Sequence, residues 1–229
     1  MSGNEIKMKI IRLALLGDSA VGKTSIISTF LNYEFNEDFI STIGWDKRKK
    51  TIKLENGKKI DLSIWDTAGQ ERFHSVALKV IRKAQGIVVV FDLTKKGTFD
   101  NVVNWLEIIK DNFNEVTIVL FGNKCDCESL REVTTEEATE FAQKKNIPYF
   151  ETSAKNNINI EEGFSKIANE VFKRHNKIEK AITLDSKGKN RDEKSCCLGR
   201  KSKKIDKKED KKEDKKEDKN VESEEKEKK

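Results

Sequence analysis

GDSAVGKT, residues 17–24, decides the fold of this 229-residue chain. It has the pattern G-x-x-x-x-G-K-S/T, in which a glycine-rich loop cradles phosphates. Before it, KIIRLALL (residues 9–16) is rich in branched apolar residues, as a buried strand is, and after Gly22 the segment KTSIISTFLNY (residues 23–33) has helical spacing. A strand, a glycine-rich turn and a helix in this order distinguish a phosphate-binding loop from an ordinary glycine turn.

The same stretch supplies the groups that hold a polyphosphate. Its backbone N–H groups can wrap an anion beside a helix N-terminus, where the helix dipole also favours negative charge. The Lys23 ammonium would reach the β- and γ-phosphates, and the Thr24 hydroxyl would hold magnesium. The residues that we expect to bind phosphate through this loop are Ser19, Ala20, Val21, Gly22, Lys23, Thr24 and Ser25.

Apolar patterns along the rest of the chain predict alternating strands and helices. Residues 47–66 alternate on both sides of Asn56-Gly57, which is a strong hairpin signal. We expect buried parallel strands at 86–93 and 116–123, a last strand at 147–153, and amphipathic helices at 98–113, 134–146 (opening with a Thr-x-x-Glu capping box) and 159–175. This order predicts an α/β fold: a six-stranded, mostly parallel sheet with one antiparallel hairpin and helices on both faces. Ligands of such sheets bind at the carboxyl ends of the strands.

WDTAGQ, residues 65–70, ends the second strand of the predicted hairpin. Asp66 stands where a carboxylate would meet magnesium through a water. The Gly69 N–H could bond a γ-phosphate, and Gln70 could orient a water for in-line attack. Asp-x-x-Gly alone is a common turn, but its place one hairpin after the phosphate loop makes it a specific signal.

GNKCD, residues 122–126, follows a buried strand and selects the base. The Asp126 carboxylate can accept hydrogen bonds from the ring N1–H and the 2-amino group of guanine, and adenine lacks this donor pair. A buried polar group left unpaired costs about 1–3 kcal/mol, and more if it is charged. Asp126 therefore rejects ATP as well as accepting GTP. The methylene stem of Lys124 can lie on the base face, and Asn123 completes the Asn-Lys-x-Asp pattern.

ETSAK, residues 151–155, follows the last predicted strand. The Ala154 N–H would meet guanine O6, Lys155 would pack beside the base, and Ser153 belongs to the same turn. A small P-loop kinase, which also has a phosphate loop, has no use for Asn-Lys-x-Asp. The loops together therefore predict a guanine-nucleotide site with GTP or GDP and Mg²⁺ as its ligands.

These motifs resemble those of the small Ras-like GTPases, and most closely the Rab branch, from about Lys9 to Arg174. The resemblance implies a P-loop GTPase domain that hydrolyses GTP to GDP slowly, with Gln70 as the catalytic residue. Phe35 would stack on guanine, although core packing also explains a phenylalanine there. Thr42 would close on magnesium and the γ-phosphate, so the expected metal-binding residues are Thr24, Thr42 and Asp66.

The resemblance also implies a switch. Segments 35–48 and 67–81 would be ordered by the γ-phosphate and released on hydrolysis. Exchange factors, GTPase-activating proteins and effectors are the implied partners of a monomer. The resulting hypothesis is a regulator of intracellular vesicle traffic in the cytoplasm, or on the cytoplasmic face of endomembranes or vesicles. Two alternatives stay open: a Ras-like signalling GTPase outside membrane traffic, and a GTP-binding module with little hydrolysis.

The chain departs from the Rab pattern where effectors bind. Rab proteins have an aromatic residue at the position of Lys47 and two tyrosines at the positions of Val80 and Ile81. Of the aromatic trio that effectors commonly contact, only Trp65 remains. The run Lys47–Lys50 has two interpretations: lysines that guard an edge strand against pairing, or a surface for an acidic effector.

Composition bounds the remaining possibilities. Apolar residues concentrate in residues 8–174, which predicts a globular domain at 8–175 followed by a disordered charged tail at 176–229. The net charge of +6 is spread and partly self-cancelling, so we expect no nucleic-acid partner. No apolar run reaches the roughly 20 residues of a membrane span. The four cysteines form no Cys-x-x-Cys, which favours reduced thiols over structural zinc.

KSCCLGR, residues 194–200, contains adjacent cysteines that resemble the prenylated pair of Rab proteins. Two lipids anchor stably where one is marginal, but such signals lie at or near the chain end. Here a tail with three KKED repeats at 207–218 comes after the pair. We therefore interpret Cys196 and Cys197 as a masked or relic lipidation site, or as two exposed thiols.

Overall fold

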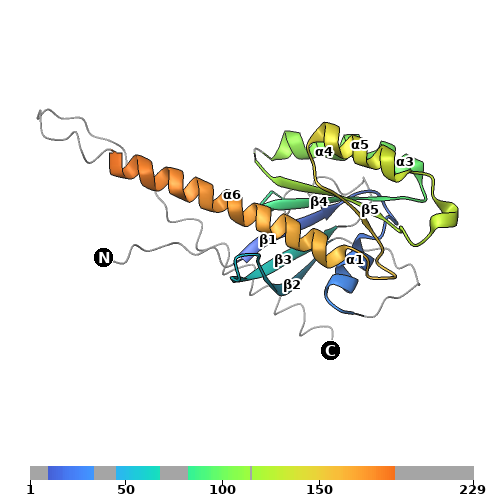
Figure 1. Cartoon of the computed structure of the whole chain (residues 1–229), viewed down its shortest axis with the longest axis horizontal. Helices are drawn as coiled ribbons and strands as arrows, with labels where there is room; N and C mark the ends of the chain where they lie inside the picture. The colour runs from blue at the N-terminus through green and yellow to red at the C-terminus, as the bar shows by residue number, and fades with distance from the viewer. Residues whose placement is uncertain (1–9, 34–44, 68–81, 114, 189–229) are drawn as a thin grey trace, which may run out of the picture. The chain divides into compact units, whose positions relative to one another are not determined.

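The structure, a computed structural model, describes residues 10–33, 45–67, 82–113 and 115–188. The chain divides into two compact units, Met1–Ile182 and Thr183–Lys229. The strands of the first unit form a six-stranded sheet in the order β2-β3-β1-β4-β5-β6 (Figure 1). They are β1 (Ile10–Leu16), β2 (Trp45–Lys53), β3 (Lys59–Thr67), β4 (Gly86–Asp92), β5 (Thr117–Asn123) and β6 (Tyr149–Thr152). β2 and β3 pair antiparallel and the other described neighbours pair parallel, which confirms the predicted fold class.

Helices cover both faces of the sheet. They are α1 (Lys23–Phe30), α3 (Lys96–Asp100), α4 (Val102–Asn112), α5 (Thr135–Lys145) and α6 (Ile160–Gly188), with a 3₁₀ turn η2 (Glu128–Leu130). α1 and α6 lie on one face and α3, α4 and α5 on the other (Figure 1). Side chains alternate along a strand, so Leu13 and Leu15 of β1 enter the first core, whereas Ala14 and Leu16 enter the second. In the first core Phe30 stacks on Phe164 with ring centroids 4.1 Å apart.

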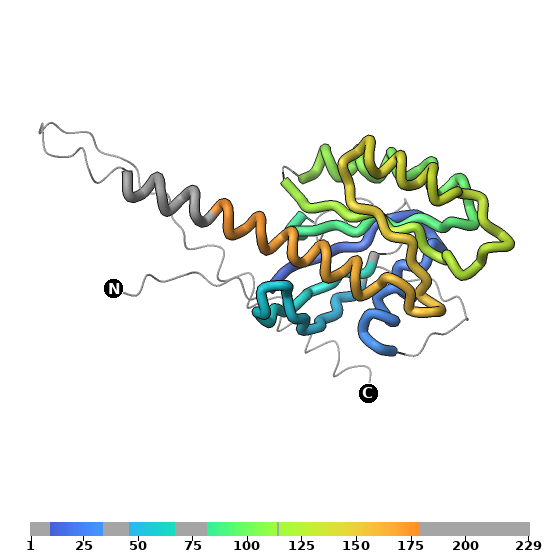
Figure 2. The backbone as a smooth tube through the Cα atoms, viewed as in Figure 1, coloured from blue at the N-terminus to red at the C-terminus, as the bar shows by residue number. Residues whose placement is uncertain are grey.

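The hairpin forms where the sequence predicts it. The Gly57 N–H donates to the Leu54 carbonyl at 2.8 Å, and the Leu54 N–H donates to the Lys58 carbonyl at 2.8 Å. Three residues, ending with Gly57 at φ 80°, therefore lie between the hydrogen-bonded residues Leu54 and Lys58, which is the loop form that needs glycine in the left-handed region. The tip lies beside α6, because the Glu55 N–H donates to Asn169 Oδ1 at 3.0 Å (Figure 2).

The single helix predicted for residues 98–113 is wrong: Asn101 separates α3 from α4. α3 is a short turn that its own polar contacts fix to β4, because Thr98 Oγ1 accepts from the Asp92 N–H at 3.0 Å and donates to the Lys95 carbonyl at 2.8 Å. A threonine that bonds backbone groups in this way competes with regular helix. Apolar periodicity cannot reveal such a break.

The helix ends follow local chemistry. α1 ends at Phe30 and not at Tyr33, because Asn32 takes a left-handed φ of 63°. The predicted capping box at the start of α5 is confirmed in its main bond, since Thr134 Oγ1 accepts from the Glu137 N–H at 3.1 Å. α6 continues to Gly188, past His175, where the sequence placed the end of the globular domain.

Candidate nucleotide-binding site

The predicted site residues gather at one edge of the sheet, where β1, β3, β5 and β6 end. Parallel strands place their carboxyl ends at a common edge, so loops distant in the sequence meet there. The structure describes Ser19, Ala20, Val21, Gly22, Lys23, Thr24, Ser25, Asp66, Asn123, Lys124, Asp126, Ser153, Ala154 and Lys155. Phe35, Thr42, Gly69 and Gln70, like Cys196 and Cys197, lie outside the described residues.

Two glycines allow the phosphate loop its path. A Cβ on Gly17 would lie 2.1 Å from the Val90 carbonyl oxygen, and a Cβ on Gly22 would lie 2.4 Å from Asn123 Nδ2. Both glycines also have positive φ, 144° and 97°, which disfavours other residues. The Asn123 side chain uses the space above Gly22 to donate to the Val21 carbonyl at 2.9 Å. This hydrogen bond joins the segment GNKCD, which is predicted to read the base, to the loop GDSAVGKT.

Lys23 lies inside the loop. Its ammonium donates to the carbonyl oxygens of Gly17 at 2.8 Å and Asp18 at 2.7 Å, and the residue is buried. Burial lowers the pKa of Lys23 to about 8, although the nearby carboxylates of Asp66 and Asp18 favour the charged form. The loop therefore contains a buried ammonium group that begins to lose its proton slightly above neutral pH.

Thr24 and Asp66 form a pair of oxygen ligands. The Thr24 hydroxyl donates to Asp66 Oδ2 at 2.7 Å. Asp66 is buried, and its Oδ1 atom has no hydrogen-bond partner in the described part of the chain. Burial raises the pKa of Asp66, while Thr24 and Lys23 oppose that shift. A buried, unsatisfied carboxylate oxygen beside a hydroxyl is a donor set that fits Mg²⁺, which prefers hard oxygen ligands.

Asp126 is held in place by two neighbouring side chains. Its Oδ1 accepts from the Ser153 hydroxyl at 2.5 Å, and its Oδ2 contacts Cys127 Sγ at 3.5 Å. Burial alone would raise the pKa of Asp126, but the hydrogen bonds from Ser153 and from its own backbone amide outweigh burial and lower it. Asp126 is therefore ionised at neutral pH and can accept two donors from a base. Burial and Asp126 together raise the pKa of Cys127, so that thiol stays protonated.

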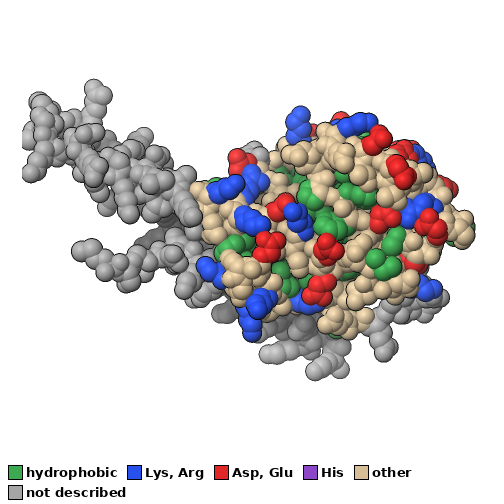
Figure 3. All heavy atoms as spheres, in the orientation of Figure 1, with side chains coloured by type: hydrophobic (Ala, Val, Ile, Leu, Met, Phe, Trp, Pro, Cys, Tyr) green, Lys and Arg blue, Asp and Glu red, His purple; other side chains and the backbone are tan. Residues whose placement is uncertain are grey.

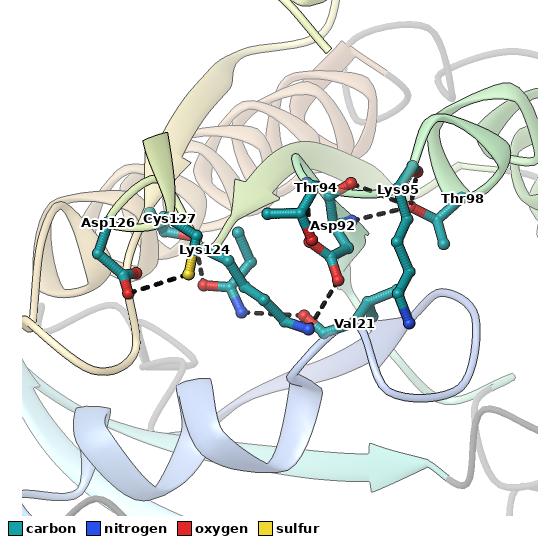
Figure 4. A network of polar contacts seen from close by, with 10 residues as sticks. Val21, Asp92, Thr94, Lys95, Thr98, Lys124, Asp126 and Cys127 are labelled. Atoms are coloured by element: carbon teal, nitrogen blue, oxygen red, sulfur yellow. Dashed lines mark hydrogen bonds and ion pairs between the residues drawn. The ribbon is translucent and has the colours of Figure 1, made fainter. Parts of the chain in front are cut away.

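The Lys124 side chain has an anchor that sequence analysis missed. Its ammonium lies 2.6 Å from Oδ2 of Asp92, which is fully buried at the end of β4 (Figure 4). Thr94 holds the other carboxylate oxygen through its N–H at 2.9 Å and its hydroxyl at 2.7 Å. Lys124 itself has a left-handed φ of 68°. The aspartate at the end of the apolar strand GIVVVFD is the sequence feature that could have indicated this anchor.

A second unpredicted network supports the turn that contains Ala154 and Lys155. Arg131 makes two parallel hydrogen bonds to Glu151, each 3.0 Å long, and Thr135 and Tyr149 donate to the same carboxylate. Burial would raise the pKa of Glu151, but its bonds to Arg131 and Thr135 outweigh burial and lower it. This network fixes β6, the strand that leads into the turn with Ala154 and Lys155.

Comparison with known proteins identifies the family. A model of the Ras family matches residues 12–173. The chain belongs to the Ras family. The Ras-family chain is 46% identical over 164 residues to Ras-related protein Rab-13 of Bos taurus, covering 71% of this chain and 80% of that protein. It is 43% identical over 192 residues to Ras-related protein Rab-10 of Diplobatis ommata, and 40% over 193 residues to GTP-binding protein ypt2 of Schizosaccharomyces pombe; each alignment covers 82% of this chain and 96% of the relative.

The predicted family is therefore confirmed, and with it the class of activity. As a Ras-family protein similar to Rab GTPases, the chain binds guanine nucleotide and is a GTPase. The individual roles predicted for its site residues remain predictions. Among the described helices, none is long and apolar enough to span a bilayer. No group of three or more potential metal-ligating side chains gathers within the described residues.

Proposed function

We propose that this Ras-family protein is a guanine-nucleotide-dependent switch in intracellular vesicle traffic, which binds GTP and hydrolyses it to GDP. The observation that carries the proposal is the 2.9 Å hydrogen bond from Asn123 to the Val21 carbonyl. This bond joins the segment that would read guanine to the loop that would wrap the phosphates. The relatives support the trafficking role, because they are Rab proteins.

Magnesium completes the proposed phosphate side. Thr24 and Asp66 would hold it, with Thr42 added in the GTP state. Bound Mg²⁺ would neutralise charge on the phosphates. The residues of the chain then supply position and charge: Lys23 meets the phosphates, and Gln70 orients the attacking water, with no covalent step. Slow intrinsic hydrolysis is expected, because the sequence has no obvious inserted arginine finger to stabilise the transition state.

On the base side, Asp126 would exchange its weak contact with Cys127 for donors on guanine. A thiol is a weak donor, so little is lost when the ring N1–H and the 2-amino group replace it. Lys124, which the buried Asp92 carboxylate holds, would lie along one face of the base, and Phe35 would stack on it. The Ala154 N–H would meet O6, with Ser153 keeping its bond to Asp126.

The switch would act through an exchange factor, a GTPase-activating protein and effectors. We propose that an effector presents an acidic surface to β2. Lys47, Lys49 and Lys53 are exposed on one side of this strand, and no carboxylate of the described residues pairs with them. The basic residues on its other side have partners within the chain, since Arg48 pairs with an aspartate at 2.9 Å and Lys50 donates to a backbone carbonyl of α1 at 2.5 Å.

A row of lysines that only guarded an edge would stop at the edge strand. Here the row continues onto the inner strand β3, where exposed Lys59 lies directly opposite Lys53. Like charges in that position are destabilising. On the face visible in Figure 3, Lys and Arg side chains are interspersed with Asp and Glu side chains. K47E/K49E is expected to abolish salt-sensitive binding of a glutamate-rich peptide, and K144E/K145E, with the same net charge, to retain it. Equal binding by both variants would rule out this surface.

Membrane attachment is a separate proposal. The GTPase domain would cover residues 8–175 and the charged tail residues 176–229, with Cys196 and Cys197 as a masked prenylation site. A monomeric, mainly cytoplasmic protein is then expected, which reaches endomembranes after trimming or S-acylation. Metabolic labelling with a prenyl precursor checks this: a chain ending at Cys197 takes up label and the full-length chain does not. Strong labelling of the intact chain at these cysteines contradicts the proposal.

Two measurements on the full-length protein test the proposed function. Fluorescent GDP should be displaced by GTP and not by ATP. Single-turnover hydrolysis should be slow in the natural chain and slower still in Gln70→Leu, because leucine cannot orient water. Displacement by ATP as readily as by GTP would contradict guanine selection. Binding without any turnover would favour the alternative of a GTP-binding module, and equal turnover in Gln70→Leu would remove the role of that glutamine.

A further inference from the structure

Asp18 places a carboxylate inside a loop whose backbone donors are built to hold anions. It precedes Ser19, the first residue of the predicted phosphate cradle. Aspartate side chains readily bond the backbone N–H two residues further on. For Asp18 that residue is Ala20, whose N–H belongs to the cradle. An unrestrained Asp18 carboxylate would therefore compete with the phosphates for the same donors and also repel them.

The structure restrains this carboxylate from the opposite side. Trp105 Nε1 donates to Asp18 Oδ1 at 2.8 Å, and Asn101 Nδ2 donates to the same oxygen at 2.6 Å. Both donors come from the start of α4, which begins directly after Asn101. Asn104 Nδ2 in turn donates to Asn101 Oδ1 at 2.5 Å and so orients the Asn101 amide.

We propose that Asn101 and Trp105 are positioning residues for nucleotide binding, and that they keep the Asp18 carboxylate out of the phosphate cradle. The break between α3 and α4 at Asn101 makes this possible, because it leaves that side chain at the start of α4 within reach of the loop. The inference rests on the proposed function in one respect: the loop must bind the phosphates of a guanine nucleotide.

A simpler role for the same contacts would be mechanical support of the loop. Asp18→Asn separates the two roles. The asparagine keeps an oxygen that can accept from Trp105 and Asn101, but it carries no charge and competes poorly as an anion. If the contacts restrain a charge, losing Trp105 Nε1 harms binding only while residue 18 is aspartate. If they support the loop mechanically, the loss is the same in both backgrounds.

The experiment is a double-mutant cycle on the full-length protein, with GDP affinity as the readout. Trp105→Phe keeps a ring for packing and removes the N–H donor. We expect W105F to weaken GDP binding by about tenfold, as the loss of a hydrogen bond to a charged group does. D18N alone and D18N/W105F are expected within about twofold of the natural chain. Single-turnover hydrolysis at saturating GTP should change little in W105F, because bound phosphates already occupy the cradle.

Asn101 provides an independent test of the same restraint. N101A removes the second donor without touching the core and should weaken GDP binding by about threefold, whereas N104A, which removes only the outer bond, should stay near the natural value. N101A also keeps the test open if W105F does not fold. Equal loss from W105F in the Asp18 and D18N backgrounds, or no loss in either, overturns the proposal. Failure of the natural chain to bind GDP at all would instead overturn the proposed function.

Discussion

The Lys124 ammonium lies 2.6 Å from the buried carboxylate of Asp92, and this ion pair crosses from the loop after β5 to the end of β4. A lysine with a left-handed backbone and a long flexible side chain would otherwise have many conformations. Asp92 limits them by drawing the ammonium to one point, so the methylene stem is already extended across the edge of the sheet. The segment that is predicted to bind the base is thus positioned by β4, a strand that supplies none of the predicted contacts with the base.

Guanine selection is expected to depend on the charge of Asp126. Asp126→Asn should weaken GTP binding by about 1–3 kcal/mol, because the new amide cannot accept both guanine donors. The same variant should gain affinity for xanthosine triphosphate, whose 2-oxo group accepts from that amide. Competition binding with both nucleotides measures the exchange. Cys127→Ala, which removes only a weak thiol contact with the same carboxylate, is the control and should change GTP affinity little. Unchanged GTP affinity in Asp126→Asn would contradict the assignment.

Magnesium removal is expected to speed GDP release. Thr24 and the unsatisfied Asp66 oxygen are the proposed ligands, so EDTA should raise the GDP dissociation rate of the natural chain. Thr24→Ala should release GDP faster before chelation and respond less to EDTA. Ser28→Ala, one turn further along α1, should behave as the natural chain does. An off-rate that EDTA leaves unchanged would show that no metal contributes to the site.

GDP affinity is expected to fall as pH rises above about 8. Burial lowers the pKa of Lys23 to about 8 in the free protein. Phosphates favour the charged ammonium, so the pKa is higher when GDP is bound. At a pH between the pKa of Lys23 in the free protein and its pKa in the GDP complex, GDP binding takes up a proton. The affinity for GDP therefore falls by up to roughly tenfold per pH unit in that range. Titrations from about pH 6.5 to 9.5 measure the slope around that pKa. Lys23→Arg keeps its charge over this range and should show no such slope; a flat profile in the natural chain would contradict the prediction.

Arg131→Met is expected to loosen the turn that contains Ala154. It removes two charge-assisted hydrogen bonds to Glu151, which should lower the free energy of unfolding by about 1–3 kcal/mol at neutral pH and speed GDP release. In the natural chain the bonds of Arg131 help to lower the pKa of Glu151, so their stabilisation is present above the unfolded-state pKa and is lost in acid. Urea unfolding should therefore show the variant and the natural chain converging as pH falls. A difference that is constant with pH would argue for packing alone.

The sequence predicted the fold class because its strongest signals are local. Continuous apolar runs and the glycine pattern at 17–24 depend on neighbours in the chain, and the same holds for the capping box at Thr134. The break at Asn101 follows Thr98, whose hydroxyl accepts a hydrogen bond from the Asp92 N–H at the end of β4, and a contact of this kind leaves no periodic trace in the sequence. The length of α6 was underestimated because charged residues after His175 continue a helix as readily as they form a tail.

For a related reason, the sequence predicted the residues that would touch the ligand but not the residues that support them. Residues that would touch the ligand lie in motifs, and the motifs are contiguous. Residues that hold those groups in place are scattered: Asp92 lies at the end of β4, and Arg131 comes just after η2, far from Glu151 in the sequence. Asp18 lies inside the phosphate-loop motif, yet only the folded chain shows that α4 contacts its side chain. Supporting residues are recognised by their neighbours in space, which a linear pattern does not contain.

Position 22 has a consequence for the design of variants. The space that a side chain there would need is filled by the Asn123 amide, 2.4 Å from where a Cβ would sit. A substitution at Gly22 therefore never changes the phosphate loop alone. Every substitution also pushes on Asn123 and, through it, on the loop that is predicted to discriminate between nucleobases. Screens that score such variants by phosphate chemistry alone would misattribute changes that originate in base recognition.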